Sequence, residues 1–143
     1  MNNNKCSSVI GVLTSIPYKI TTDFIESKTY DQLNFYLVDI SSHVVARIQS
    51  YISFVGKKIL RNNFYYINSE CNISFLSTNE EFRNKGLATH LLQMMINFCK
   101  EHHINLITLD DDSDNFNTFN NVYVKAGFVY KINGYPEMYM VLR

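Results

Sequence analysis

A six-residue run at positions 83–88, Arg-Asn-Lys-Gly-Leu-Ala, has the composition of a phosphate-binding loop. It precedes an amphipathic helix that we expect to begin near Gly86, and helix N-termini expose unpaired backbone N–H groups with a positive partial charge. Gly86, which has no Cβ, and the small Ala88 would let a phosphate approach the backbone closely. Arg83 and Lys85 could add charge-assisted contacts. The run therefore predicts a diphosphate site, although it matches neither a Walker A loop nor a GxGxxG loop.

The same run resembles the pyrophosphate-binding motif of the GNAT superfamily of N-acetyltransferases, which reads Arg or Gln, two residues, Gly, one residue, then Gly or Ala. Arg83, Gly86 and Ala88 occupy those positions. Further along, the segment 123–128, Tyr-Val-Lys-Ala-Gly-Phe, is similar to the second signature of the family, Tyr-x-Lys-x-Gly-Phe, which ends a helix before a strand. The resemblance covers roughly residues 70–143 and implies an acetyl-CoA-dependent N-acetyltransferase.

The resemblance implies acetyl-CoA as the cofactor and indicates where its parts bind. The pyrophosphate would lie on the backbone N–H groups between Arg83 and Thr89, and the pantetheine would pair with the exposed edge of the strand that ends at Ser77. A backbone N–H near Leu76 is then a candidate donor to the oxyanion. The cofactor-binding residues implied in this way are Phe75, Leu76, Ser77, Arg83, Asn84, Lys85, Gly86, Leu87, Ala88, Thr89, Asn117, Asn120 and Lys125.

The resemblance also indicates the catalytic groups. Tyr123 would protonate the departing thiolate, and this role rests on proximity because a phenol is about 1.5 units weaker as an acid than a thiol. The acceptor amine must lose a proton, which at pH 7 costs roughly 4.6 kcal/mol for an ordinary ammonium group. The segment 104–109, where the acceptor cleft of the family opens, is followed by an acidic cluster, Asp110, Asp111, Asp112 and Asp114. We expect the carboxylates of residues 110–112 to recognise or deprotonate a cationic acceptor.

The chain departs from the family pattern at three places. Positions 74 and 75 hold Ser and Phe where the family often has a carboxylate, so the motif assigns no general base. Phe116 and Phe119 replace the Asn and the small residue that usually precede the tyrosine, and the nearby Asn117 and Asn120 become the candidates for pantetheine contacts. The first half of the chain also lacks the long helix that the family often places between its first two strands.

Each candidate residue has a structural interpretation beside the functional one. Arg83 and Lys85 are compatible with solvated loop charges, and Gly86 with a turn glycine. Tyr123, at helical spacing, is compatible with a core position. The aspartate cluster is also typical of a solvated loop or of a capping run before a helix. No set of residues has metal-ligand spacing, so no metal site is predicted.

The elements that would position these residues follow from hydrophobic periodicity. Apolar residues recur at helical spacing over 86–102, and a second helix is expected over 116–126, ended by Gly127. Ser41-Ser42 predicts a short turn, and Asn133-Gly134 is a hairpin signal. Strands are expected over 34–40, 43–52, 72–77, 104–109, 128–132 and 138–142, and 58–67 stays ambiguous. The order predicts an α+β (mixed α/β) fold, with a central mixed, largely antiparallel GNAT-like sheet and helices on both faces.

Length and charge limit the function classes. The 143 residues correspond to a single domain, 1–143, and the net charge of zero argues against a dedicated nucleic-acid binder. The longest early apolar run, residues 9–13, is too short for a membrane span or a secretory core. The three cysteines show no CxxC spacing, so reduced thiols and a cytoplasmic location are expected.

The expected function is therefore acetyl-CoA-dependent N-acetylation of a small cationic primary amine, such as a polyamine or an amino sugar. The acidic cluster favours this acceptor class, and no nucleic-acid or membrane partner is expected. Alternatives are an acetyltransferase acting on protein lysines or N-termini, a non-catalytic acyl-CoA-binding module, and an unrelated α+β domain with a chance motif. A monomer and a homodimer are both compatible with the sequence.

Overall fold

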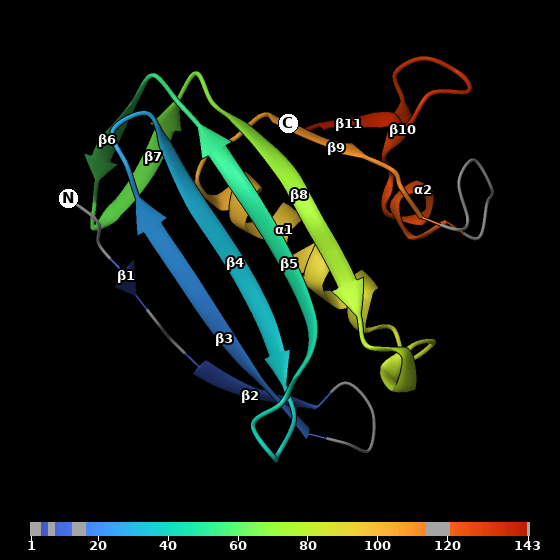
Figure 1. Ribbon diagram of the computed structural model, residues 1–143. Helices are drawn as coiled ribbons and strands as arrows, with labels where there is room; N and C mark the ends of the chain where they lie inside the picture. The colour runs from blue at the N-terminus through green and yellow to red at the C-terminus, as the bar shows by residue number, and fades with distance from the viewer. Residues whose placement is uncertain (1–3, 6–7, 13–16, 114–120, 143) are drawn as a thin grey trace.

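Residues 4–5, 8–12, 17–113 and 121–142 are described by a computed structural model of the chain (Figure 1). Within them, one nine-stranded sheet has the strand order β1-β3-β4-β5-β8-β9-β11-β10, with β2 paired to β3, and β6 and β7 form a separate hairpin. Its strands are β1 Asn4–Lys5, β2 Ser8–Val12, β3 Pro17–Glu26, β4 Tyr30–Val38, β5 Val44–Ser53, β8 Glu70–Thr78, β9 Leu106–Asp110, β10 Val129–Tyr130 and β11 Glu137–Val141. The other elements are β6 Gly56–Leu60, β7 Asn63–Ile67, the 3-10 helix η1 Glu80–Phe82, α1 Leu87–Glu101 and α2 Val122–Ala126.

Helix α1 covers one face of the sheet and builds the core with it (Figure 1). Its buried residues recur at helical spacing and are Leu87, Leu91, Leu92, Met95, Ile96 and Cys99. Alternate residues of β5 point toward them, since Ile48 and Ile52 are fully buried and the Ser50 hydroxyl lies 3.4 Å from the Met95 sulfur. Each fully buried Leu or Ile contributes about 1.5–3 kcal/mol. This packing holds the first turn of α1 in a defined position over the sheet.

Two turns of the first half follow from local chemistry. The Asp39 carboxylate accepts hydrogen bonds from the backbone N–H groups of Ser41 and His43, both at 2.9 Å. That turn confirms the one predicted at Ser41-Ser42, and it ends β4 at Val38, before the predicted end at residue 40. The ambiguous segment 58–67 is the β6–β7 hairpin, whose two loop residues, at 61 and 62, have positive φ of 53° and 66°. Both values are typical of the two-residue loops that connect the strands of a hairpin.

The mixed, largely antiparallel sheet confirms the predicted fold class, because β8 and β9 are the only strands of the described residues that pair in parallel. Helices on both faces were expected, whereas Figure 1 shows α1 behind the strands and no described helix in front of β3, β4, β5 and β8. One physical reason is chain length, since only residues 27–29 separate β3 from β4 and only residues 39–43 separate β4 from β5. Among the described residues, no helix has the length and apolar character needed to cross a membrane.

The second half agrees with the predicted elements, with one shortened helix. The helix predicted over 116–126 is described only from Val122, because Asn121 has extended dihedral angles and caps it. Residues 114–120 lie outside the described part of the chain. Gly127 ends α2 with φ of 107°, as its predicted C-cap position requires. The final hairpin turns at Gly134, which has φ of 89°.

Candidate active site

The strands β8 and β9 separate halfway along β8, and the gap is the origin of the site. Their parallel pairing covers only Cys71 to Ile73 of β8, and the remaining residues, 74–78, have no strand partner on that side within the described residues. The separation coincides with a β-bulge, because Gln49 and Ser50 of β5 pair with Phe75 and Ile73, which leaves Ser74 unpaired. Bulges bend the strand that carries them. The bend therefore opens the sheet beside residues 74–78.

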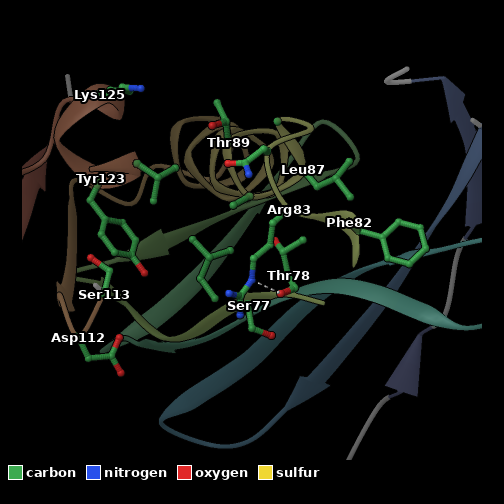
Figure 2. Close-up of a pocket in the computed structure, with 15 residues that line it drawn as sticks. Ser77, Thr78, Phe82, Arg83, Leu87, Thr89, Asp112, Ser113, Tyr123 and Lys125 are labelled. Atoms are coloured by element: carbon green, nitrogen blue, oxygen red, sulfur yellow. Dashed lines mark hydrogen bonds between the residues drawn. The ribbon is translucent and has the colours of Figure 1, made fainter. Parts of the chain in front are cut away.

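A cavity of about 670 Å³ lies at this opening. The end of β8, the loop before α1, the first turn of α1, the loop after β9 and helix α2 all contribute to its wall (Figure 2). The lining residues are Leu76, Ser77, Thr78, Phe82, Arg83, Asn84, Gly86, Leu87, Ala88, Thr89, Asp112, Ser113, Val122, Tyr123 and Lys125. Segments that are far apart in the sequence are thus brought to one concave site, as small-molecule pockets require.

The first turn of α1 presents unpaired backbone donors to the cavity. Its N-cap is Gly86, with φ of 77°, and no side chain caps the helix. The carbonyl of Gly86 accepts from the N–H of His90, so the first intrahelical bond is in place while the N–H groups of residues 87–89 lack intrahelical acceptors. A Cβ added at Gly86 would meet no atom within 4 Å, so here the left-handed backbone is what calls for glycine. This terminus fits a diphosphate group.

Arg83 lies beside that terminus. Its Nε donates a hydrogen bond to the carbonyl of Thr78 at 3.3 Å, and the side chain is otherwise exposed to the cavity. The contact ties the guanidinium to the end of β8 and leaves its two terminal nitrogens available. An arginine held in this way is suited to bind phosphate oxygens in a bidentate manner.

Helix α2 is anchored by its cap. The Asn121 side-chain carbonyl accepts from the N–H groups of Tyr123 at 2.8 Å and Val124 at 3.1 Å. Its amide donates to Asp111 at 2.7 Å and to the Ser113 hydroxyl at 3.1 Å. The helix has only five residues, and helices this short are not stable without outside contacts. Asn121 therefore links α2 to the loop that follows β9.

Tyr123 projects from α2 into the cavity, and Figure 2 shows its ring pointing inward. Only 6% of the residue is exposed, and its hydroxyl makes no hydrogen bond to another described residue. Burial, together with the negative charges of Asp112 and Asp111, raises the pKa of Tyr123 to about 12. The phenol therefore stays protonated at neutral pH and can donate a proton.

The three described aspartates of the cluster lie in three different environments. Asp112 lines the cavity, and Asp111 is buried at 2% exposure. Asp110 is exposed at the end of β9, opposite Glu137 of β11, and does not line the cavity. Burial alone would raise the pKa of Asp111, but hydrogen bonds from Ser113, Tyr130 and Asn121 outweigh it and hold that pKa below its ordinary value. Residue Asp114 lies outside the described part of the chain.

Most of the predicted cofactor residues line this one cavity: Leu76, Ser77, Arg83, Asn84, Gly86, Leu87, Ala88, Thr89 and Lys125. Lys85 and Phe75 do not, since both side chains are exposed elsewhere, and Phe75 faces Arg47, whose guanidinium lies 5.7 Å from its ring. Asn117 and Asn120 lie outside the described residues. Sequence reasoning missed the lining residues Thr78, Phe82, Ser113 and Val122, and the anchoring role of Asn121. For Asn121 a signal existed, because Asn is a preferred N-cap residue.

The chain matches the Acetyltransferase (GNAT) family over residues 14–128. A comparison with curated protein sequences finds no match. Solved structures share the fold at low sequence identity. Arylalkylamine N-acetyltransferase 2 from Aedes aegypti is 12% identical, with a TM-score of 0.58 over 77% of this chain and 73% of that one. A GNAT-family acetyltransferase from Staphylococcus aureus Mu50 is 20% identical, with a TM-score of 0.56 over 78% and 68%.

A third similar structure is that of the NatC complex bound to Gag peptide and CoA, at 18% identity and a TM-score of 0.54 over 77% of this chain and 71% of that one. These likenesses concern the fold, whereas the family match covers more than half of the sequence and includes both signature segments. The match confirms the predicted enzyme class, an acyltransferase, and acetyl-CoA as its cofactor. The chain belongs to the GNAT family of acetyltransferases.

Proposed function

We propose that this acetyltransferase transfers the acetyl group of acetyl-CoA to a small cationic primary amine, such as a polyamine or an amino sugar. One observation carries the proposal. A single cavity joins an uncapped helix N-terminus, a protonated buried tyrosine and the carboxylate of Asp112. These are the groups that anion binding, thiolate protonation and ammonium recognition require.

The cofactor would be held mainly by backbone groups. The N–H groups of Leu87, Ala88 and Thr89 bind the diphosphate, and Arg83 adds charge-assisted hydrogen bonds. The unpaired edge of β8 at residues 74–78 offers N–H and C=O groups to the pantetheine arm, as a sheet edge does to an added strand. Lys125 lines the same cavity, and Lys85, Asn117 and Asn120 stay predicted contacts. Acetyl-CoA supplies the activated thioester when bound.

The acceptor end of the cavity is assigned to Asp112. Its carboxylate lies in the wall beside Tyr123, and in Figure 2 it stands on the opposite side of the drawn cavity from Thr89. A carboxylate there attracts a cationic amine and accepts its proton directly or through water. Asp110 lies outside the wall, at the exposed end of β9, where it adds negative charge to the approach. Because of these negative charges, a cationic amine fits the acceptor end better than a neutral acceptor does.

The chemical step then needs one acid. The amine nitrogen forms a bond to the acetyl carbon, the carbon–sulfur bond breaks, and Tyr123 gives its proton to the departing sulfur. The amine proton goes to Asp112 or to water. Because its pKa is raised to about 12, the phenol carries its proton across the physiological range. The raised value also makes it a weaker acid, so the transfer depends on its proximity to the sulfur. The backbone N–H groups near Leu76, on the unpaired part of β8, are the candidate donors to the carbonyl oxygen.

The test combines binding with turnover. We expect acetyl-CoA and CoA, each at about 100 times the dissociation constant, to stabilise the fold by roughly 2.7 kcal/mol, whereas ATP does so weakly. A thiol-release assay with polyamines, amino sugars, lysine peptides and N-terminal peptides then identifies the acceptor. Turnover of small amines supports the proposal. Turnover of peptides alone assigns a protein acceptor instead, and binding without any turnover indicates a non-catalytic module.

A further inference from the structure

Asp111 is the most completely bonded carboxylate near the cavity. Within the described residues, its carboxylate accepts four hydrogen bonds: from the backbone N–H and the hydroxyl of Ser113 at 3.0 and 2.6 Å, the amide of Asn121 at 2.7 Å, and the hydroxyl of Tyr130 at 2.6 Å. The residue is only 2% exposed. No ion pair joins it to a cation within the described residues. A buried carboxylate is costly, so its retention with neutral donors alone calls for an explanation.

The bonds of Asp111 hold α2 from both sides. Asn121 precedes the helix and caps it, and Tyr130 lies in β10, which directly follows it. Through Asn121, the carboxylate is one hydrogen bond away from the backbone N–H of Tyr123. Since the five-residue helix has little stability of its own, these bonds help to fix where the tyrosine ring stands, together with the edge contact between that ring and Phe128. The remaining donor, Ser113, belongs to the cavity wall itself.

We infer that Asp111 is a positioning residue for acetyl transfer, which holds the Tyr123 hydroxyl at the reacting sulfur through the Asn121 cap. The inference rests on the proposed function, because it takes Tyr123 as the proton donor. Asp111 is not among the residues that line the cavity, so the inference gives it no direct contact with cofactor or acceptor. It differs in this from Asp112, which sequence reasoning grouped with it.

A second consequence concerns protonation. The charged groups that share the cavity wall with Tyr123 are Asp112 from the loop after β9, Arg83 from the loop before α1, and Lys125 from α2. Together with Asp112, the buried charge of Asp111 raises the pKa of Tyr123, which burial has already raised. Removal of that charge is expected to lower the alkaline pKa in the pH profile of kcat. The alkaline limb of that profile would stay in place if Tyr123 were not the group that titrates there.

The decisive comparison uses an exchange of the two bonded groups. Asp111→Asn breaks the pattern, because the new amide faces the donors of Asn121 and Tyr130. The double variant Asp111→Asn/Asn121→Asp exchanges carboxylate and amide, so that the amide at 111 can donate to a carboxylate at 121, which still caps α2. We expect Asp111→Asn to lower kcat by about 100-fold with the Kd for acetyl-CoA unchanged, since a misplaced catalytic group has an effect of that order. The double variant is expected to recover most of kcat.

Asp39→Asn is the matched control. Asp39 is another carboxylate held by hydrogen bonds, in its case from two backbone N–H groups, both at 2.9 Å, but it lies in the turn after β4 and lines no part of the cavity. Its substitution is expected to lower stability without a change in kcat. If Asp111→Asn folds poorly, Tyr130→Phe removes one bond to the same carboxylate and is expected to lower kcat by about 3- to 10-fold.

Two results would overturn the inference. One is an unchanged kcat in folded Asp111→Asn and Tyr130→Phe, and the other is a double variant that is no more active than Asp111→Asn. Tyr123→Phe separates this failure from failure of the proposed function. If Tyr123→Phe loses activity while Asp111→Asn keeps it, only the positioning role is wrong. If Tyr123→Phe keeps full kcat, the proton-donor role of Tyr123 in the proposed function is wrong as well.

Discussion

Two carboxylates are buried among the residues that the structure describes, and their surroundings differ in one respect. Asp31 at the start of β4 is fully buried, and Asp111 after β9 is 2% exposed. Each accepts a hydrogen bond from a tyrosine hydroxyl, from Tyr66 at 2.7 Å and from Tyr130 at 2.6 Å. Asp31 is also paired with the ammonium group of Lys57, whereas Asp111 has only neutral donors among the described residues. The first pair is neutral as a whole, and the second cluster keeps its negative charge beside the cavity.

The Lys57 ammonium lies in a cage of aromatic rings. Its nitrogen is 5.0 to 5.5 Å from the ring centres of Phe24, Phe54, Phe64 and Tyr66, and 3.4 Å from Glu26. Lys57 belongs to the β6–β7 hairpin, and the rings come from β3, β7 and the end of β5, so the cage fastens the hairpin to the main sheet. One buried carboxylate thus pairs with a cation that fastens a hairpin to the sheet, and the other keeps its charge beside the cavity, where we infer that it positions Tyr123.

The largest effect is expected from removing the tyrosine hydroxyls one at a time. Tyr123→Phe should lower kcat by about 10²- to 10⁴-fold, because a proton donor is lost, and should leave stability nearly unchanged, because that hydroxyl makes no hydrogen bond to another described residue. Tyr66→Phe should do the reverse: it leaves Asp31 with one donor fewer and lowers the free energy of unfolding by about 1–3 kcal/mol. Steady-state kinetics and urea denaturation of both variants test the contrast. Equal loss of kcat in the two would contradict it.

Next in size is the loss of the caged cation. Lys57→Met leaves Asp31 buried without its counter-charge, so the free energy of unfolding should fall by about 3–5 kcal/mol. The affinity for acetyl-CoA should not change at temperatures where the variant is folded, since Lys57 lines no part of the cavity. Adding Asp31→Asn to this variant should restore part of the stability, because the unpaired charge is then gone. A double variant as unstable as Lys57→Met would show that the cage, not the ion pair, dominates.

Arg83 is the corresponding cation of the cavity, and its loss should have the opposite signature. Arg83→Ala is expected to weaken acetyl-CoA binding by about 10- to 100-fold, the range for one charge-assisted hydrogen-bonding group, with little change in unfolding. Calorimetric titration and thermal unfolding give the two values. Because the side chain is exposed, a loss of stability without a loss of affinity would make Arg83 a structural loop residue.

The smallest expected effect is on the free energy of unfolding at acid pH. The pKa of Asp111 is lowered in the folded state, so its hydrogen bonds stabilise the fold above the ordinary aspartate pKa and are lost as the pH falls through the lowered value. We therefore expect the free energy of unfolding to decrease on acidification below about pH 4, and to decrease less in Asp111→Asn. Denaturation curves at a series of acid pH values test this. Parallel decreases in both proteins would mean that Asp111 does not contribute.

Much of the fold was predictable because its signals are local. The alternation over 43–52 and the helical spacing over 86–102 each need only a short window of sequence, and both elements are present as β5 and α1. The opening between β8 and β9 was expected only from the family resemblance, as an exposed edge of the strand that ends at Ser77, and could not be predicted from the residues themselves. It depends on the bulge at Ser74 and on where the parallel register ends, and both arise from pairing between distant segments.

The candidate site, like the fold, has a part that local sequence predicted and a part that it did not. The loop proposed to bind the diphosphate is contiguous, so its spacing alone made Arg83, Gly86 and Ala88 candidates, and all three line the cavity. The separation of Asp111 from Asp110 and Asp112 was not found, because it depends on the direction of the chain after β9 and on bonds from Asn121 and Tyr130. Asn121 itself was treated as part of a longer helix, although its preference for capping was a usable signal.

The most direct test of the cavity as the cofactor site is calorimetric titration of acetyl-CoA into the wild-type protein and Ala88→Glu. Ala88 lies in the first turn of α1 and lines the cavity. A glutamate there favours the helix, because a negative charge at a helix N-terminus is stabilising, but it places a carboxylate where the diphosphate should bind. We expect Ala88→Glu to fold with an unchanged or higher melting temperature and to lose acetyl-CoA binding. Equal affinity in the two proteins would contradict the assignment of this helix N-terminus as the cofactor site.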